Sequence, residues 1–166
     1  MALVSFEARA QMSVVKPVQF GIAAGAAIPM SDLSDIANTG FNGTVTVGFT
    51  PAMIPLGVRI DGAYNHFGIK DALGGGNVHI TSVTGNLVYK IPAATISPYA
   101  IGGAGWYNVG FSDGGGSENK FGWNLGGGIL LPLSGFQTFI EARYNQVQFS
   151  NAPSLKFIPI TFGIMF

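Results

Sequence analysis

Bulky apolar residues alternate with smaller or more polar residues along most of this chain, in eight segments separated by residues that favour turns. The last segment, residues 157–166, has two faces, which are Ile158, Ile160, Phe162, Ile164 and Phe166 on one side and Phe157, Pro159, Thr161, Gly163 and Met165 on the other. Successive side chains of a β-strand point to opposite faces, so a period of two residues indicates strands rather than helices. We therefore predict eight strands joined by turns and loops.

The other seven segments repeat this alternation with different residues on the second face. In residues 58–65 and 139–145, apolar residues lie on one face and charged and amide residues on the other. In residues 82–90, the second face carries hydroxyl and amide residues and Lys90. Residues 20–28, 44–49, 99–109 and 121–129 oppose bulky residues to small ones. In residues 99–109 the bulky face is Tyr99, Ile101, Tyr107 and Val109, and the small face is Ala100, Gly102, Ala104 and Asn108.

The composition decides which face meets lipid. Charged residues make up 10% of the 166 residues, against about 25% in a typical soluble domain. No apolar run approaches the roughly 18 residues of a transmembrane helix, and only helices and closed barrels satisfy their backbone groups in lipid. The glycine-rich small faces suit a narrow lumen better than a surface in water. The sequence thus predicts an all-β fold, an eight-stranded antiparallel up-and-down transmembrane β-barrel with its bulky faces, that of residues 99–109 included, in lipid.

The connections alternate in length and so predict two different rims. Residues 51–55, 92–97 and 132–135 are short and contain proline, whereas residues 31–40, 68–76 and 112–120 are longer and polar; the connection at 150–154 is short. Short turns face the periplasm in outer-membrane barrels, so both termini are expected there. Aromatic residues near both rims predict two interfacial girdles, which are Phe49, Tyr89, Tyr99, Phe136 and Phe166 near the turns and Phe41, Tyr64, Phe67, Tyr107, Phe111, Phe121, Trp123 and Phe149 near the loops.

The N-terminus ends in a small-x-small pattern, Ala8-Arg9-Ala10, that is typical of a signal-peptidase site. The apolar stretch before it is short, and no basic segment precedes that stretch. We interpret residues 1–10 as the remnant of a signal peptide or a disordered N-terminus, and residues 11–166 as one outer-membrane β-barrel domain.

Four charges fall on the inward faces of two strands, Arg59 and Asp61 on one and Glu141 and Arg143 on the other. These are the third and seventh strands, which oppose each other in a ring of eight. Buried charges need partners because desolvation is costly, so we predict a paired lumen cluster that plugs the barrel. The alternative is a gated polar path for ions.

The chain offers little catalytic or metal-binding chemistry. Cysteine is absent, which excludes disulfides and thiolate metal sites. His66 and His79 lack the spacing of a metalloprotease or hydrolase motif, and we interpret them as interfacial polar aromatics. Residues 112–119 match a Ca²⁺ loop in composition alone, and Gly74-Gly75-Gly76 and Gly126-Gly127-Gly128 are not phosphate-binding fingerprints. We predict no catalytic residue, metal or cofactor, and with no basic patch, no nucleic-acid partner.

Three segments carry a family resemblance: residues 157–166, residues 97–105 with Pro98-Tyr99 and glycines, and Ile140-Glu141-Ala142-Arg143-Tyr144. Together they resemble the small outer-membrane-protein β-barrel family of the OmpA-like and opacity-protein-like kind. The resemblance implies a Gram-negative outer membrane, contact with its lipid and lipopolysaccharide, and a monomeric or weakly oligomeric barrel. It also implies insertion by the barrel-assembly machinery, with Phe162, Ile164 and Phe166 as the assembly signal.

Our first hypothesis is a non-enzymatic integral outer-membrane barrel with a structural or surface-interaction role and a lumen closed by the charged cluster. The alternative is a porin-like barrel that transports small solutes or hydrophobic compounds. Transport needs a continuous lumen or a lateral opening, and Pro159 could break strand pairing locally. A soluble lipocalin-like binder is a third hypothesis, which monomeric behaviour without detergent would support.

Overall fold

The structure is a computed structural model that describes residues 17–51, 54–92, 96–112, 116–150 and 152–166. The signal-peptide interpretation of residues 1–10 lies outside the described residues. Among the described residues, no helix is long and apolar enough to cross a membrane.

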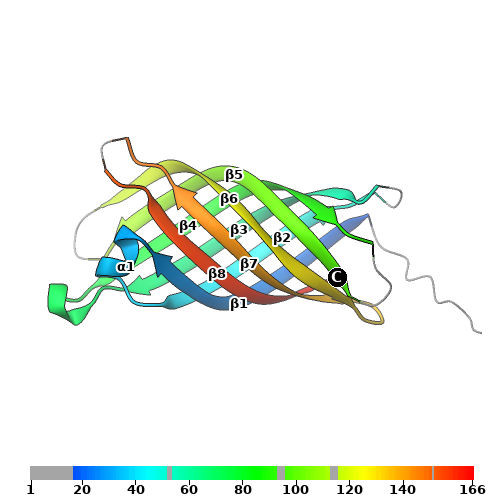
Figure 1. The fold of residues 1–166 in the computed structure, drawn as a ribbon, viewed down its shortest axis with the longest axis horizontal. Helices are drawn as coiled ribbons and strands as arrows, with labels where there is room; N and C mark the ends of the chain where they lie inside the picture. Colours follow the sequence, from blue (N-terminus) through cyan, green and yellow to red (C-terminus); the bar gives the residue numbers. More distant parts are fainter. Residues whose placement is uncertain (1–16, 52–53, 93–95, 113–115, 151) are drawn as a thin grey trace, which may run out of the picture.

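Eight strands form one sheet in the order of the sequence, and each is antiparallel to its neighbours. They are β1 (Val18–Met30), β2 (Gly40–Phe49), β3 (Leu56–Gly68), β4 (Asn77–Lys90), β5 (Ser97–Phe111), β6 (Ser117–Pro132), β7 (Gln137–Val147) and β8 (Leu155–Met165). The sheet is a closed barrel with strongly tilted strands (Figure 1). The predicted fold class is therefore confirmed.

The first and last strands close the barrel. β1 pairs with β8 from Gly21 opposite Met165 to Met30 opposite Lys156. Beyond that ladder, the Phe166 amide donates to the Phe20 carbonyl at 2.7 Å and the Phe20 amide donates to the Phe166 carbonyl at 3.2 Å. The sheet thus has no free edge, as a barrel in lipid requires.

The predicted faces are confirmed in seven of the eight strands. In β8, for example, Phe157, Thr161 and Met165 are buried in the lumen, while Phe162 and Phe166 are exposed on the outside. The outer surface is correspondingly apolar, with Ile22, Val45, Ile60, Leu125 and other large side chains more than half exposed.

The eighth strand, β5, has its faces inverted relative to the prediction. Tyr99, Ile101, Tyr107 and Val109 are buried in the lumen, and Trp106 is 69% exposed on the outside. The middle of β5, residues 102–105, contains only glycine and alanine, so no bulky side chain fixes the phase of the alternation there. The register decides it instead, because Ile101 pairs with the inward Val88 of β4 and Tyr99 with the inward Lys90.

The prediction of two aromatic girdles is wrong for three rings, which lie in the lumen. Tyr99 belongs to neither girdle, because its ring fills the lumen near the turns, and the Phe67 and Tyr107 rings fill it near the loops. The exposed rings on the barrel's outside remain at both ends, which are Phe49, Tyr89, Phe136 and Phe166 at one and Phe41, Tyr64, Phe111 and Phe121 at the other.

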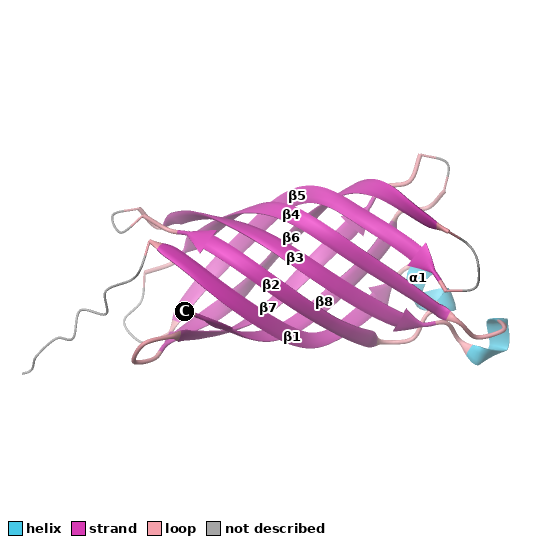
Figure 2. Cartoon of the chain, turned by 180° about the vertical axis from the view of Figure 1, so that it is seen from behind, coloured by secondary structure: helices cyan, strands magenta, loops and turns pink. Residues whose placement is uncertain are grey.

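Connections of two kinds separate the two ends of the barrel, which we name the turn rim and the loop rim. The turn rim holds the β2–β3, β4–β5 and β6–β7 connections and the carboxyl terminus, and the loop rim holds the other four connections (Figure 2). Two elements at the loop rim were not predicted, the helix α1 (Asp32–Ile36) and the 3₁₀ turn η1 (Asp71–Leu73). The loop predicted at 112–120 is shorter than expected, because β6 begins at Ser117.

Helix α1 folds over the mouth of the barrel at the loop rim. Its Leu33 is 1% exposed and packs with the apolar residues of the strand ends. The β3–β4 loop holds α1 in place. The backbone amide of Lys70 donates to the Ile36 carbonyl at 2.9 Å, and the Lys70 Nζ donates to the Ser34 carbonyl at 2.8 Å.

Strand pairing is interrupted at one place in the wall. β7 and β8 pair from Gln137 to Ala142 and again from Asn145, so Arg143 and Tyr144 have no partner across the seam. The register places Pro159 opposite Arg143, and proline has no N–H to donate. On its other side Pro159 pairs with Ala27 of β1, where the ladder is continuous. The prediction that Pro159 breaks pairing locally is therefore confirmed on the β7 side.

Candidate functional site

The lumen holds the polar side chains that the outer surface lacks. Arg59 and Asp61 point inward from β3, and Glu141 and Arg143 point inward from β7, on the opposite side of the ring. All four are buried, with Asp61 1% exposed and Arg143 8%. The structure thus brings together the four charged residues that the sequence placed in the lumen.

The four charges form a closed ring of ion pairs across the barrel axis, which we name the charge quartet. The Arg59 Nη2 lies 2.9 and 2.7 Å from the two carboxylate oxygens of Glu141, and the Arg143 Nη1 lies 2.8 Å from the Asp61 Oδ2. Within each strand, Arg59 also bonds Asp61 and Arg143 also bonds Glu141. The formal charges cancel, and each carboxylate meets two guanidinium groups, which satisfies buried charge better than a single pair.

Neutral side chains complete the hydrogen bonding of both carboxylates. The Tyr99 hydroxyl donates to the Glu141 Oε2 at 2.7 Å. The Thr46 hydroxyl and the Asn86 amide donate to Asp61 at 2.5 and 3.0 Å. Asn86 in turn accepts from Asn124, whose Oδ1 is the one buried side-chain oxygen or nitrogen of the described residues that has no hydrogen-bond partner. The quartet is thus held by four further strands, β2, β4, β5 and β6.

Apolar clusters close the lumen on both sides of this polar layer. At the loop rim, Leu33 of α1 packs with Phe67, Tyr107, Phe157 and other buried residues. At the turn rim, Val88, Tyr99, Ile101, Leu130, Phe139 and Met165 form a second cluster. Some of these rings lie directly over glycines, since a Cβ added at Gly163 would meet the Phe139 ring at 2.3 Å.

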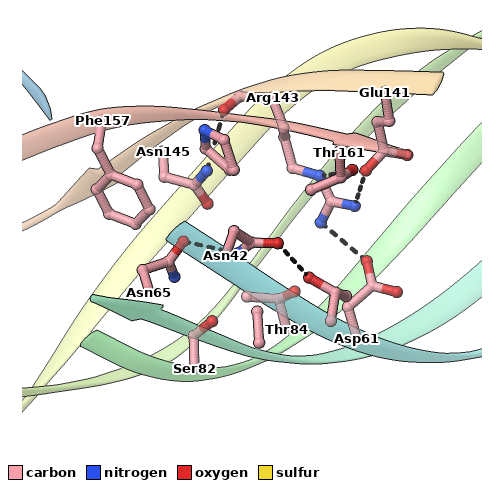
Figure 3. A pocket seen from close by; sticks show the side chains of 13 residues that line it. Asn42, Asp61, Asn65, Ser82, Thr84, Glu141, Arg143, Asn145, Phe157 and Thr161 are labelled. Atoms are coloured by element: carbon pink, nitrogen blue, oxygen red, sulfur yellow. Dashed lines mark hydrogen bonds and ion pairs between the residues drawn. The ribbon is translucent and has the colours of Figure 1, made fainter. Parts of the chain in front are cut away.

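Small cavities lie on both sides of the charge quartet. The loop-side cavity is about 30 Å³, and Asp61, Glu141 and Arg143 line it together with amide and hydroxyl side chains (Figure 3). The turn-side cavity is about 20 Å³, and its charged lining residues are Arg59 and Lys90. A single water needs roughly 10–15 Å³ of such volume, so each cavity has room for about one to three water-sized groups.

The two histidines lie outside the lumen. His66 of β3 and His79 of β4 are register partners at the loop rim. They stack with Phe41 and Tyr64, at ring-centroid distances between 5.1 and 6.5 Å. Neither histidine has a hydrogen bond or ion pair with another described residue. Within the described ranges, no three His, Cys, Asp or Glu residues gather as a metal site would need.

The three residues of the predicted assembly signal share one face. Phe162 and Phe166 are about half exposed on the outside of the barrel, and Ile164 lies between them on the same side of β8. Their role in assembly stays a prediction.

Sequence reasoning missed Tyr99, Asn86, Thr46 and Asn124 as partners of the charge quartet. The phase error in β5 hid Tyr99, although Trp106 gave a signal, because the largest apolar side chain of the strand suits lipid better than a narrow lumen. The alternation placed Thr46, Asn86 and Asn124 inward correctly. It does not show how far along the barrel axis each of these side chains lies.

Comparisons with known proteins agree with this architecture. A family model described as "Outer membrane protein beta-barrel domain" matches residues 1–166, whereas no curated protein matches the chain. The crystal structure of Neisserial surface protein A (NspA) is similar with a TM-score of 0.74 and 15% identity, covering 90% of this chain and 96% of that one.

Two further solved structures share the fold at lower similarity. Ail, the attachment invasion locus protein of Yersinia pestis, has a TM-score of 0.54 and 23% identity, with 91% of this chain and 100% of that chain covered. The outer membrane enzyme PagL has a TM-score of 0.55 and 16% identity, with 89% and 98% covered. At these identities the likeness extends to the fold alone. The proteins that share this fold include an enzyme as well as surface proteins.

Proposed function

Because this chain belongs to the outer membrane protein β-barrel family, we propose that it is a non-enzymatic, monomeric barrel with a closed lumen and a structural or surface-interaction role. Its place is the bacterial outer membrane, where its apolar belt contacts lipid and lipopolysaccharide. The proposal includes the orientation, with the loop rim outside and the turn rim and both termini in the periplasm.

The closed lumen rests on one observation: the barrel axis is filled in three successive layers. The apolar cluster under α1, the charge quartet and the apolar cluster at the turn rim follow one another along it. The cavities between them, about 30 and 20 Å³, are too small to form an aqueous channel, which eight strands do not enclose in any case.

Conductance in planar bilayers tests the closed lumen. Protein that shows the heat-modifiable gel shift of a folded barrel is reconstituted at increasing protein-to-lipid ratio. We expect no steady openings above the bare membrane. Long-lived ohmic openings that grow in number with protein would overturn the closed lumen and favour the transport alternative.

Our proposal that the protein is not an enzyme rests on the surroundings of its candidate general bases. Activating a nucleophile requires a base within hydrogen-bond reach of it, and His66 and His79 contact aromatic rings. Since the outer membrane enzyme PagL shares this fold and lipid is the substrate that surrounds a barrel in the membrane, lipid hydrolysis is the activity to assay. We expect the purified protein to leave radiolabelled phospholipid and lipid A intact, and release of fatty acid that a His79→Asn variant abolishes would contradict this.

The surface role rests on the loop rim, which is ordered by α1 and by its ties to the β3–β4 loop. A rigid surface suits binding, because little entropy is lost when a partner docks. Ail, which shares the fold, is named as an attachment invasion locus protein, and we propose the same broad class of role here.

Epitope insertion tests the orientation. A tag between Gly74 and Gly75 lies at the loop rim, and a tag between Leu133 and Ser134 lies at the turn rim. We expect antibody to label intact cells with the first tag, and to label the second only after the outer membrane is permeabilised. The reverse pattern would overturn the proposed orientation.

A further inference from the structure

We infer that the turn-side cavity binds a small monovalent anion of halide size, held between the side chains of Arg59 and Lys90. The cavity is about 20 Å³, and its polar lining residues are Gln19, Thr50, Arg59, Lys90 and Tyr99. Its remaining walls are glycine and apolar residues, and no carboxylate of the described residues lines it. The inference does not depend on the conductance of the barrel or on its role at the cell surface.

The charge quartet divides its charges unequally between the two cavities. Both carboxylates, Asp61 and Glu141, line the loop-side cavity, and Arg143 lines it with them. Arg59 lines the turn-side cavity instead, where the nearest other charge on the lining is the half-buried Lys90. The two charged groups on the lining of the turn-side cavity are therefore both cations, although the quartet as a whole is neutral.

Lys90 adds one positive charge that no described residue compensates. Among the described ranges, its Nζ has neither a hydrogen-bond nor an ion-pair partner. Lys120 offers the contrast, because it lies at the loop rim and its Nζ is paired with Glu118 at 2.9 Å. A cation half removed from water gains from a counter-charge, so Lys90 favours an anion beside it.

Arg59 supplies a second set of donors to the same cavity. Its Nε donates to Asp61 at 3.1 Å and its Nη2 donates to Glu141 at 2.7 Å. Only 6% of the Arg59 side chain is exposed. Its Nη1 makes no hydrogen bond with a described residue and is not fully buried, as expected of a group that faces the cavity. A polar group that faces such a cavity takes water or a bound ion as its partner, and an anion here accepts from Arg59 and Lys90 at once.

The size of the cavity limits the class of anion. About 20 Å³ exceeds the roughly 10–15 Å³ that one water needs but leaves no room for the five heavy atoms of phosphate or sulfate. Chloride is the obvious physiological member of the halide class, and bromide is its traceable substitute. The competing occupant is water, with Lys90 extended toward the solvent at the turn rim.

Anomalous diffraction distinguishes these occupants. Crystals of the full chain grown in sodium bromide are measured at the bromine absorption edge. We expect a peak within 3.5 Å of the Arg59 Nη1 and the Lys90 Nζ, and its loss in a Lys90→Met variant, which keeps most of the length of the side chain without the charge. Density without an anomalous peak at this place identifies water and would overturn the proposal.

Thermal unfolding in detergent gives a measurement in solution that does not rely on crystals. The midpoint is followed in sodium bromide and in sodium gluconate at equal ionic strength, since gluconate is too large for the cavity. We expect a saturable rise in bromide alone, as binding to the folded state requires. The bromide affinity should fall at least tenfold in Lys90→Met and stay within twofold in Lys120→Met. An equal response to both salts, or an unchanged response in Lys90→Met, would refute the site.

Discussion

The side-chain amide of Asn145 donates a hydrogen bond of 3.1 Å to the backbone carbonyl of Arg143. This carbonyl lies opposite Pro159, which has no N–H to offer across the β7–β8 seam. Asn145 therefore replaces a missing rung of the ladder. Inside a barrel wall this matters, because an unsatisfied buried carbonyl costs about 1–3 kcal/mol.

This relationship predicts a coupling between Asn145 and Pro159. Asn145→Leu should destabilise the barrel by about 1–3 kcal/mol, because the Arg143 carbonyl and the Tyr107 hydroxyl both lose a partner. In a Pro159→Ala background, where a backbone N–H is restored, the same change should cost about 1 kcal/mol less. Urea unfolding in lipid vesicles, followed by tryptophan fluorescence, measures both. Additivity of the two changes within about 0.3 kcal/mol would contradict the replacement.

The charge quartet predicts that removing one charge is worse than removing a pair. Asp61→Asn leaves two guanidinium groups facing one carboxylate and should cost about 3–5 kcal/mol. Asp61→Asn combined with Arg143→Met leaves intact the pair in which the Arg59 Nη2 contacts both carboxylate oxygens of Glu141, so it should cost less than the single change. Equilibrium unfolding of both variants decides, and a double variant less stable than Asp61→Asn would count against a mutually paired cluster.

The inverted faces of β5 predict where its tryptophan lies. With Trp123→Phe removing the other tryptophan, the Trp106 fluorescence should be quenched strongly by brominated lipid, because its side chain is 69% exposed on the outside. A matched control carries Tyr107→Trp in a chain without Trp106 and Trp123, and this lumen position should be quenched several-fold less. Equal quenching at both positions would restore the orientation expected from the alternation.

Ring packing over glycine predicts a steric effect at one position. An alanine Cβ at Gly163 would meet the Phe139 ring at 2.3 Å, so Gly163→Ala should cost about 1–3 kcal/mol by overpacking. Gly43→Ala is the control, since nothing lies within 4 Å of its Cβ position. Adding Phe139→Leu should recover part of the loss at position 163. A Gly163→Ala variant as stable as Gly43→Ala would show that the ring moves aside without cost.

The alternation along the chain was sufficient to predict the fold, the closure of the sheet into a barrel and the four charged residues of the lumen. It failed in β5, where residues 102–105 are all small and the phase is set by pairing with β4. It also left out α1, because five residues cannot show a helical period. Leu33 becomes buried through contacts between loops and strand ends that are distant in sequence, and a local pattern carries no trace of them.

The closing partnership of β1 with β8 also constrains how the chain reaches this structure. Phe20 and Phe166 are among the last residues to become available to each other, since one lies near the start of the barrel and the other at the end of the chain. Contacts of such long sequence separation form slowly. Until they form, β1 and β8 each present an open edge that can pair with another chain. A chain that lacks β8 leaves the edges of β1 and β7 open and is therefore expected to aggregate, so closure of the sheet depends on β8.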